Sequence, residues 1–551
     1  MIPNKEIRRL LSLYAELLDL HRKDSKFAKV LSSAAYYTRR ISEDIMSLDK
    51  FGISKMFRPR IGRLLTELQK TGTIAALDEL IHLTPAGLFE LMRIKGLGGK
   101  KLGVIWHVLK IDTMEDLLKA CQENKLSKIP GFGTRTESNI IKAIESYTSH
   151  QDHFRYAAVA DAADHLVLHL QKIGKTKLIS LCGDIRRKTT TLARIEILAA
   201  KKFMASSLKK YMIVQSSTKT ETKGISVDEI PVTIYHTAAA DYFPDLFRRT
   251  GHENHVKKVL SKVKGKLPGG SEEAIYAKAN LPFVPPEMRE DNAEWDFAGK
   301  PEDLVTLKDI KGVVHNHTTY SDGVDTLENF VKACIDKKFE YTVISDHSKN
   351  AHYAGGLKEE KVLRQFKEID ALNKAIRPFR IFKSIECDIR VSGELDFDNA
   401  FLKKFDLVIV SIHQLLKMDE AKATKRLIRA IENPYTTILG HMTGRLLLIR
   451  PGYPIDFKKV IDACAANGVV IEINTNPYRL DMDWSHIPYA MKKGVMISVN
   501  PDAHSIKEID NIRWGIAAAR KGGLTKSMTW NAKSLNEISK WLADRSRWHG
   551  L

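Results

Sequence analysis

Seven short apolar segments follow one another between residues 308 and 551, and each ends in polar residues, most of which can bind metal ions. They read GVVHNHT, YTVISDH, FKSIECD, LVIVSIH, TTILGHM, VVIEINTN and VMISVNPDAH, and stretches of helical periodicity separate them. Strands that alternate with helices pair in parallel, so this repetition predicts a β/α barrel. Because active sites of such barrels lie at the C-terminal strand ends, we expect the polar residues to meet there.

Nine side chains at these strand ends have metal-binding chemistry: His315, His317, Asp322, His347, Glu386, His413, His441, Asp502 and His504. A single histidine at a strand end is more often a hydrogen-bonded core residue. Nine such groups at successive strand ends instead predict a multinuclear metal site. Imidazoles and carboxylates without thiolates suit Zn²⁺, Mn²⁺ or Fe²⁺.

The motifs HNHTTYSDG, SDHS, GHMTGRLL and NPDAH resemble those of the polymerase-and-histidinol-phosphatase (PHP) family of metal-dependent phosphoesterases, over roughly residues 308–551. The resemblance implies a distorted barrel of seven strands with three divalent ions. One ion would be bound by His315, His317, Glu386 and Asp502, a second by Glu386, His413 and His441, and a third by Asp322, His347 and His504. Asp322 stands where some relatives have histidine, and its oxygen ligand slightly favours Mn²⁺.

The same resemblance implies catalytic roles. His315, His317, Glu386, Asp502 and His504 would act around the ions, and Arg445, Lys349 and Tyr320 are candidates for holding the substrate phosphate. Such a cluster activates water at neutral pH, so no serine or cysteine nucleophile is needed.

The front half of the chain is strongly basic. The whole chain has a formal net charge of +20, of which residues 1–270 carry +18, residues 271–310 carry −6 and residues 311–551 carry +8. This distribution makes a polyanion the first partner to consider. Charge alone does not exclude a basic protein that binds no nucleic acid, so sequence motifs are needed to distinguish the two.

Two similar glycine turns lie within residues 84–148. The segments IKGLG (94–98) and IPGFG (129–133) each precede basic residues and a predicted helix. Their glycines let backbone amides approach an anion at a helix N-terminus. They resemble helix-hairpin-helix motifs, which bind DNA phosphates without reading sequence. The predicted DNA-binding residues are Gly96, Gly98, Lys100, Lys101, Gly131, Gly133 and Arg135, and a monovalent cation at the turns is a further candidate.

With these motifs ahead of a PHP-like half, the whole chain resembles the bacterial family X DNA polymerases. The segments YAKANLPFVPPEMRE and FRRTGHENHV are similar to further motifs of that family. The fold class implied is multidomain: α-helical N-terminal and helix-hairpin-helix domains, an α+β nucleotidyltransferase-like palm and thumb, and the barrel. The expected domains are 1–82 (helical), 83–150 (helix-hairpin-helix), 151–235 (palm), 236–300 (thumb and connector) and 308–551 (PHP).

The palm motif departs from that family. The resemblance implies a Gly-Ser turn and two arginines for the triphosphate, an Asp-x-Asp strand, and a third aspartate on a neighbouring strand. Here the turn reads Gly183-Asp184-Ile185-Arg186-Arg187, the strand reads Arg194-Ile195-Glu196, and Asp228 stands for the third aspartate. Arginine offers no lone pair to a cation. We therefore expect Arg194 to pair with Glu196 or Asp228, Asp184 to repel a triphosphate, and nucleotidyl transfer to be absent.

The N-terminal region also lacks the hairpin of relatives that excise abasic sugars. In SKMFRPRIGRLLTEL, Arg63 lies near the position of their Schiff-base lysine, and Lys55 is a remote alternative. Guanidinium does not form a useful imine, so lyase activity is not expected.

The leading hypothesis is a DNA-binding, metal-dependent phosphodiesterase of DNA repair, a 3′–5′ exonuclease or a nuclease at abasic or blocked 3′ ends. Its DNA would be primer–template, gapped or damaged. The alternatives are an active gap-filling polymerase with a PHP exonuclease, a non-catalytic DNA-binding scaffold, and a small-molecule phosphatase. Five scattered cysteines suit a reducing cytosol, and the sequence has neither a signal-peptide core nor an apolar run long enough to span a membrane. We expect a cytoplasmic, nucleoid-associated protein without a membrane partner. The sequence does not fix the oligomeric state, for which a monomer is the expectation.

Overall fold

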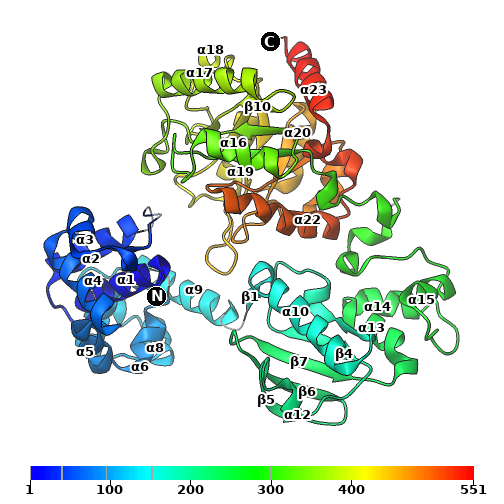
Figure 1. The fold of residues 1–551 in the computed structure, drawn as a ribbon, viewed down its shortest axis with the longest axis horizontal. Helices are drawn as coiled ribbons and strands as arrows, with labels where there is room; N and C mark the ends of the chain where they lie inside the picture. Colours follow the sequence, from blue (N-terminus) through cyan, green and yellow to red (C-terminus); the bar gives the residue numbers. More distant parts are fainter. Residues whose placement is uncertain are drawn as a thin grey trace. The chain divides into compact units, whose positions relative to one another are not determined.

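The computed structural model describes residues 2–38, 41, 43–94, 96–150, 153–297 and 299–550. It divides into two compact units, Met1–Asp152 and His153–Leu551. Figure 1 traces both along the chain.

The first unit is helical. Its helices are α1 (Asn4–Leu20), α2 (Ser25–Thr38), α3 (Lys50–Met56), α4 (Pro59–Thr71), α5 (Ala75–Leu83), α6 (Ala86–Leu91), α7 (Gly99–Leu109), α8 (Met114–Gln122) and α9 (Thr134–His150). Helices α1 and α7 pack closely, since a Cβ at Gly99 would lie 2.2 Å from the carbonyl oxygen of Glu16. One hydrophobic core contains side chains from α1 through α9. The predicted boundary between residues 82 and 83 therefore does not separate two cores.

The palm begins the second unit. Helix α10 (Tyr156–Gly174) packs against a five-stranded sheet of order β2-β4-β7-β6-β5. The strands are β2 (Ile179–Leu181), β4 (Ile195–Ala199), β5 (Met212–Ser217), β6 (Glu221–Ser226) and β7 (Pro231–His236). Two short strands, β1 (Phe154–Arg155) and β3 (Thr191–Leu192), pair separately. Glu196 thus lies in β4, and Arg194 lies in the short connection between β3 and β4.

The thumb and connector follow. Helices α13 (Tyr242–Thr250), α14 (Glu253–Leu260) and α15 (Glu272–Lys278) surround a small core of their own. The fully buried Arg289 donates to Glu272 at 2.5 Å, so a charged pair stabilises the inside of this segment.

The C-terminal half is a parallel barrel. The strands are β8 (Gly312–Asn316), β9 (Tyr341–Ile344), β10 (Arg380–Lys383), β11 (Glu386–Asp388), β12 (Val408–Ser411), β13 (Thr436–Leu439), β14 (Val470–Asn474) and β15 (Ile497–Asn500). They form two parallel sheets, β10-β9-β8 and β11-β12-β13-β14-β15. Single bridges, His347 to Glu386 and Asn316 to Ala503, join the two sheets. Because β10 and β11 are one interrupted strand, seven strand positions result, as predicted.

Helices cover the outside of this barrel (Figure 1). They are α16 (Leu327–Asp336), α17 (Glu359–Ala375), α18 (Asn399–Leu402), α19 (Glu420–Ile431), α20 (Phe457–Ala466), α21 (Ile487–Lys492), α22 (Ile512–Lys521) and α23 (Leu535–Trp548). The multidomain fold class expected from the sequence is confirmed. Among the described residues, no helix has the length and apolar character needed to span a lipid bilayer.

Candidate functional site

All nine side chains predicted to bind metal ions come together at the C-terminal ends of the barrel strands. Their ligand atoms fall into four overlapping groups, and the atoms within each group lie within 4.8 Å of one another. The groups are His317, Asp322, His347 and His504; His315, Glu386 and His441; His315, His317 and Asp502; and His347, Glu386 and His413. Among the three predicted ligand sets, only Glu386 belonged to more than one. In the structure His315, His317, His347 and Glu386 each belong to two groups.

Glu386 lies at the centre of the cluster and is 1% exposed. Its Oε1 is 3.3 Å from His315 Nε2, 3.1 Å from His413 Nε2 and 3.0 Å from His441 Nε2. Ligands about 2.0–2.1 Å from a tetrahedral ion lie about 3.3–3.4 Å apart. Neither carboxylate oxygen accepts a well-formed hydrogen bond from any described residue. A buried carboxylate in this state fits a metal ion, since buried polar atoms otherwise find hydrogen-bond partners.

A second group contains His315, His317 and Asp502. Asp502 Oδ1 is 3.1 Å from His317 Nε2 and 3.6 Å from His315 Nε2. Simple strand alternation does not produce this convergence. His315 has a left-handed φ of 65°, and the pairing of β8 with β9 shifts register between Val313 and Asn316. Such conformations are costly and concentrate at functional sites.

The third group is built on the loop that follows β8. Asp322 Oδ1 lies 3.3 Å from His504 Nε2 and 3.6 Å from His347 Nε2. The loop is fixed by the buried Asp346, which accepts hydrogen bonds from the backbone N–H and hydroxyl of Thr318, both at 2.8 Å. Asp346 therefore positions the loop of a candidate ligand and is not itself part of the four groups.

Two buried carboxylates that sequence reasoning missed orient the imidazoles. Nδ1–H of His315 donates to Glu472 at 2.6 Å, and Nδ1–H of His413 donates to Asp388 at 2.5 Å. Each bond leaves the Nε2 lone pair directed into the cluster, as in carboxylate–histidine–metal arrangements. The available signals were a carboxylate inside the otherwise apolar strand VVIEINTN and a second carboxylate, two residues after Glu386, at the end of FKSIECD.

The charges of the cluster are coupled. Burial alone would lower the pKa values of His413 and His504, but Glu386 and Asp388 raise that of His413 to about 10, and Asp322 and Asp502 raise that of His504 to about 9. A bound metal ion would therefore displace a proton from each of these two rings.

Burial alone would raise the pKa of Asp322, but His504 and the neighbouring imidazoles lower it to about 2. Burial is likewise outweighed at Glu386 and Asp502, whose pKa values lie well below their usual range because several imidazoles surround them. Burial and adjacent imidazoles lower the pKa of His317 to about 3, so its ring is neutral at pH 7. Anionic carboxylates and a neutral imidazole are the forms that bind metal ions.

Arg445 does not have the predicted role. Its guanidinium donates to the carbonyl oxygen of Arg479 at 2.9 Å, to Asp483 at 2.7 Å and to the carbonyl oxygen of Leu480. These bonds hold the loop after β14 and leave Arg445 in a structural role, contrary to the prediction that it holds substrate phosphate. The other two phosphate candidates are also paired, Lys349 with Glu359 at 2.5 Å and Tyr320 with Glu368 at 2.7 Å.

Arg479 and Tyr353, neither of which was predicted from the sequence, lie at the cluster instead. Nε of Arg479 is 3.8 Å from Asp502 Oδ2. No hydrogen bond from its guanidinium to another described residue accompanies this contact. The Tyr353 ring is 57% exposed and lies 6.3 Å from the ring of His347 and 6.5 Å from that of His413. A free guanidinium and an exposed aromatic ring beside the cluster can contact a phosphate and a base.

The palm retains one carboxylate at its own candidate metal site. Strand β7 pairs in parallel with β4 so that Thr233 stands opposite Glu196. Asp228 lies in the exposed turn between β6 and β7, so the expectation that it is the neighbouring-strand carboxylate is wrong. Arg194 is exposed and has no ion pair within 4 Å among the described residues, so the expected pairing with Glu196 or Asp228 is also wrong. Glu196 accepts from the Tyr235 hydroxyl at 2.9 Å.

The predicted triphosphate arginines are engaged within the protein. Arg186 donates to Glu272 at 2.5 Å, and Arg187 donates to Glu290 at 2.8 Å. Arg187 also pairs with Asp184, the carboxylate of its own turn. Gly183 has a φ of 63°, and a Cβ there would lie 2.0 Å from a Glu196 oxygen, which shows how closely that side chain packs on the turn.

The glycine turns of the first unit have the predicted geometry. Gly96 and Gly131 have φ values of 89° and 88°, and Gly98 and Gly133 precede α7 and α9. A Cβ at any of the four would meet no atom within 4 Å, so the turns are open to an approaching ligand. The basic residues Lys100, Lys101 and Arg135 are exposed, and Lys100 lies 4.0 Å from Asp19.

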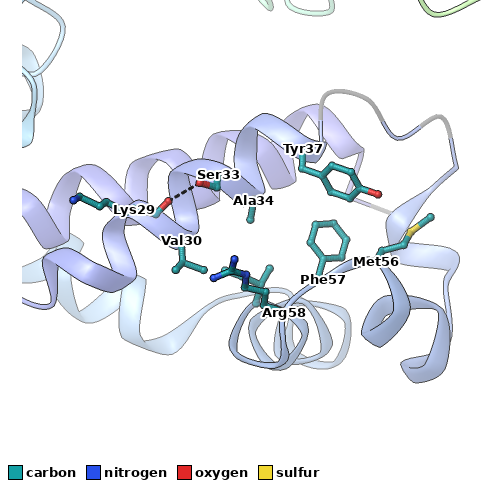
Figure 2. Close-up of a pocket in the computed structure, with 9 residues that line it drawn as sticks. Lys29, Val30, Ser33, Ala34, Tyr37, Met56, Phe57 and Arg58 are labelled. Atoms are coloured by element: carbon teal, nitrogen blue, oxygen red, sulfur yellow. Dashed lines mark hydrogen bonds between the residues drawn. The ribbon is translucent and has the colours of Figure 1, made fainter.

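A cavity of about 360 Å³ lies between α2 and the segment that joins α3 to α4 (Figure 2). Its lining includes Lys29, Tyr37 and Phe57. The lyase candidates Lys55 and Arg63 are exposed and do not line it. The cavity therefore gives no support to lyase chemistry at Lys55 or Arg63.

Comparisons with known proteins agree with this arrangement. A model of the PHP domain matches residues 314–476, and a model of the SAM-like helix-hairpin-helix tandem matches residues 88–146. The DNA polymerase/3′-5′ exonuclease PolX of Bacillus subtilis (strain 168) is 32% identical over 569 aligned positions, which cover 98% of this chain and 99% of the relative. A probable phosphatase of Thermoanaerobacter sp. (strain X514) is 28% identical over 251 positions, which cover 43% of this chain and 97% of the relative.

Proposed function

The chain belongs to the family X DNA polymerases with a C-terminal PHP domain, the PolX family, and on this premise we propose that it hydrolyses DNA phosphodiester bonds in the barrel and does not add nucleotides in the palm. The observation that carries the proposal is the contrast between the two sites. The barrel brings nine candidate ligand side chains together, whereas Glu196 is the one carboxylate at the paired β4 and β7 positions of the palm that the structure describes. The reaction proposed is 3′–5′ exonuclease cleavage, or cleavage at abasic or blocked 3′ ends.

The barrel residues have separable roles in this proposal. His315, His317, Glu386 and Asp502 would hold one divalent ion, Glu386, His413 and His441 a second, and Asp322, His347 and His504 a third. Bound divalent ions supply Lewis acidity and lower the pKa of coordinated water. Glu472 and Asp388 keep the Nε2 atoms of their histidines directed inward. Arg479 is the candidate for holding the substrate phosphate, and Tyr353 for contact with the terminal base.

Loss of polymerase activity follows from charge. Two magnesium ions need several carboxylates to bind the triphosphate and primer hydroxyl. The permanent positive charge of Arg194 disfavours a cation near Glu196, and Thr233 adds no anionic ligand. Asp184 already pairs with Arg187, the arginine that a triphosphate would need.

Binding to DNA is assigned to the helix-hairpin-helix tandem. Its open glycine turns and exposed basic side chains suit contacts with phosphates that do not depend on sequence. The proposed substrates are therefore DNA ends of any sequence, in primer–template, gapped or damaged duplexes.

The test incubates the purified protein with 5′-labelled primer–template, Mn²⁺ and all four deoxynucleotides. We expect the primer to shorten and not to lengthen. The matched control is the Glu386→Gln variant, in which shortening must be lost, because a contaminating nuclease would persist. Primer extension by the wild-type protein would overturn the assignment of the palm, and the absence of Mn²⁺-dependent cleavage would overturn that of the barrel.

A further inference from the structure

A side chain of the palm lies at the edge of the barrel site. The guanidinium carbon of Arg155, at the end of β1, is 3.3 Å from the centre of the Tyr478 ring. Tyr478 belongs to the loop after β14 and directly precedes Arg479, whose Nε is 3.8 Å from Asp502. Consecutive Cα atoms are 3.8 Å apart. The ring under Arg155 and the side chain that contacts a candidate metal ligand therefore belong to adjacent residues.

This position of Arg155 is built into the second unit. Phe154 and Arg155 pair with β3, which fixes the backbone of β1. Beside it, Ala160 of α10 packs with Leu480 and Trp514 of the PHP half in one small core. The contact between palm and barrel thus consists of several packed residues.

A second ion pair lies in the same contact. Arg513 pairs with Asp161 at 2.8 Å, and both side chains are about half exposed. This pair holds the palm against the barrel without touching the candidate ligands. It therefore offers a matched control for the role of Arg155.

Among the residues that the structure describes, none gives the Arg155 guanidinium an anionic partner. One of its terminal nitrogens, Nη1, is buried and has no hydrogen-bond partner among the described residues. No carboxylate of the described chain lies within 4 Å of it. Guanidinium is always charged and carries five donors, and buried donors without partners are rare. The side chain as a whole is only partly buried, so a phosphate at its accessible edge would supply the anion that the described residues do not.

We propose that Arg155 and Tyr478 form a composite subsite, shared by palm and barrel, for a nucleotide that neighbours the scissile bond in a DNA strand. The inference rests on the proposed nuclease function. The guanidinium binds the phosphate of that nucleotide, and the ring, 44% exposed, offers a stacking surface for its base. The palm thereby contributes to hydrolysis as a binding element, and the site distinguishes a DNA strand from a small phosphodiester.

The test compares two substrates of the full-length protein with Mn²⁺: a 3′-overhang oligonucleotide and bis(p-nitrophenyl) phosphate, which has no neighbouring nucleotide. In Arg155→Ala, the ratio of kcat/KM for the oligonucleotide to that for the small ester falls roughly tenfold, because one charge-assisted phosphate bond is lost. The fall lies mainly in KM, and the salt slope of oligonucleotide binding decreases by about 1. Arg155→Lys recovers part of the ratio, since it keeps the charge.

Arg513→Ala separates binding from structure, because it removes a cation from the same contact. It should leave the ratio unchanged. An equal loss of both activities in Arg155→Ala, or the same ratio change in Arg513→Ala, would reduce Arg155 to a structural contact and overturn the inference. If the wild-type protein cleaves neither substrate, the proposed nuclease function fails first. If it cleaves both and Arg155→Ala matches it, the subsite alone fails.

Discussion

The Glu472→Gln variant tests whether the buried carboxylates outside the ligand set control metal binding. Glu472 is fully buried, and its two oxygens accept four hydrogen bonds. Oε2 accepts from His315 Nδ1 at 2.6 Å and from Asn500 Nδ2 at 2.8 Å. Oε1 accepts from the His441 N–H and from Asn474 Nδ2, both at 3.0 Å. All four partners are donors.

A glutamine of the same size cannot satisfy this arrangement. In either orientation its NH₂ group faces two donors, so two hydrogen bonds are lost. Leaving a buried donor unpaired costs about 1–3 kcal/mol, so the folded protein is destabilised by roughly 2–6 kcal/mol. His315 also loses the carboxylate that fixes its tautomer, and such changes weaken metal affinity about 10–100-fold, or about 1.4–2.8 kcal/mol.

The assay is calorimetric titration of the metal-stripped protein with Mn²⁺, together with near-ultraviolet circular dichroism to verify the fold. Glu420→Gln is the matched control, since Glu420 is exposed on α19. We expect weaker Mn²⁺ binding in Glu472→Gln and wild-type binding in the control. A folded Glu472→Gln protein with unchanged Mn²⁺ affinity would refute the argument that this carboxylate orients His315 toward an ion.

Three further predictions concern the ligands and the thumb. Glu386→Gln should lower Mn²⁺-dependent cleavage of labelled DNA at least about a hundredfold, because Glu386 belongs to two ligand groups; retained activity would exclude it as a ligand. A chelator should abolish cleavage and added Mn²⁺ restore it, as followed on gels; cleavage that survives chelation would exclude a metal-dependent reaction. Glu272→Gln should destabilise the second unit by about 3–5 kcal/mol in urea denaturation at pH 7, because the buried Arg289 loses its partner, while Glu273→Gln changes little. Burial raises the pKa of Glu272, but Arg289 and Arg186 lower it below 4.5. The stabilisation is therefore present above pH 4.5 and lost on further acidification. If Glu272→Gln lost as much free energy of unfolding as the wild-type protein over the same acid range, this explanation would be contradicted.

The barrel ligands could be predicted because their chemistry coincides with a periodic pattern. Parallel barrel strands have their C-terminal ends on one face. Side chains at those ends, such as His315 and His413, therefore come together whatever the packing of the intervening helices. The prediction needed only the order of the strands. Which ligand binds which ion could be predicted less well. His315 reaches the cluster through a left-handed backbone conformation and a register shift, and no alternation pattern indicates either.

The positions of residues in the loops that follow the strands could not be predicted from the sequence. Arg445 and Arg479 both follow predicted strands and carry the same charge. Hydrogen bonds to backbone carbonyls and to Asp483 turn Arg445 into a loop contact, and they leave Arg479 beside Asp502. Which of two arginines faces a site depends on the path of the loop backbone, and residue type does not encode it.

The palm illustrates a different limit, because a parallel pair is set by register and not by proximity in sequence. Asp228 precedes β7 by a few residues and is the aspartate closest to the start of that strand in the sequence. The hydrogen bonds between β4 and β7 instead bring Thr233 opposite Glu196. Strand β6 forms the hairpin whose turn contains Asp228, and this turn moves the carboxylate away from the site. The palm consequently has fewer metal ligands than its sequence indicated, which strengthens the electrostatic case that chemistry in this chain belongs to the barrel.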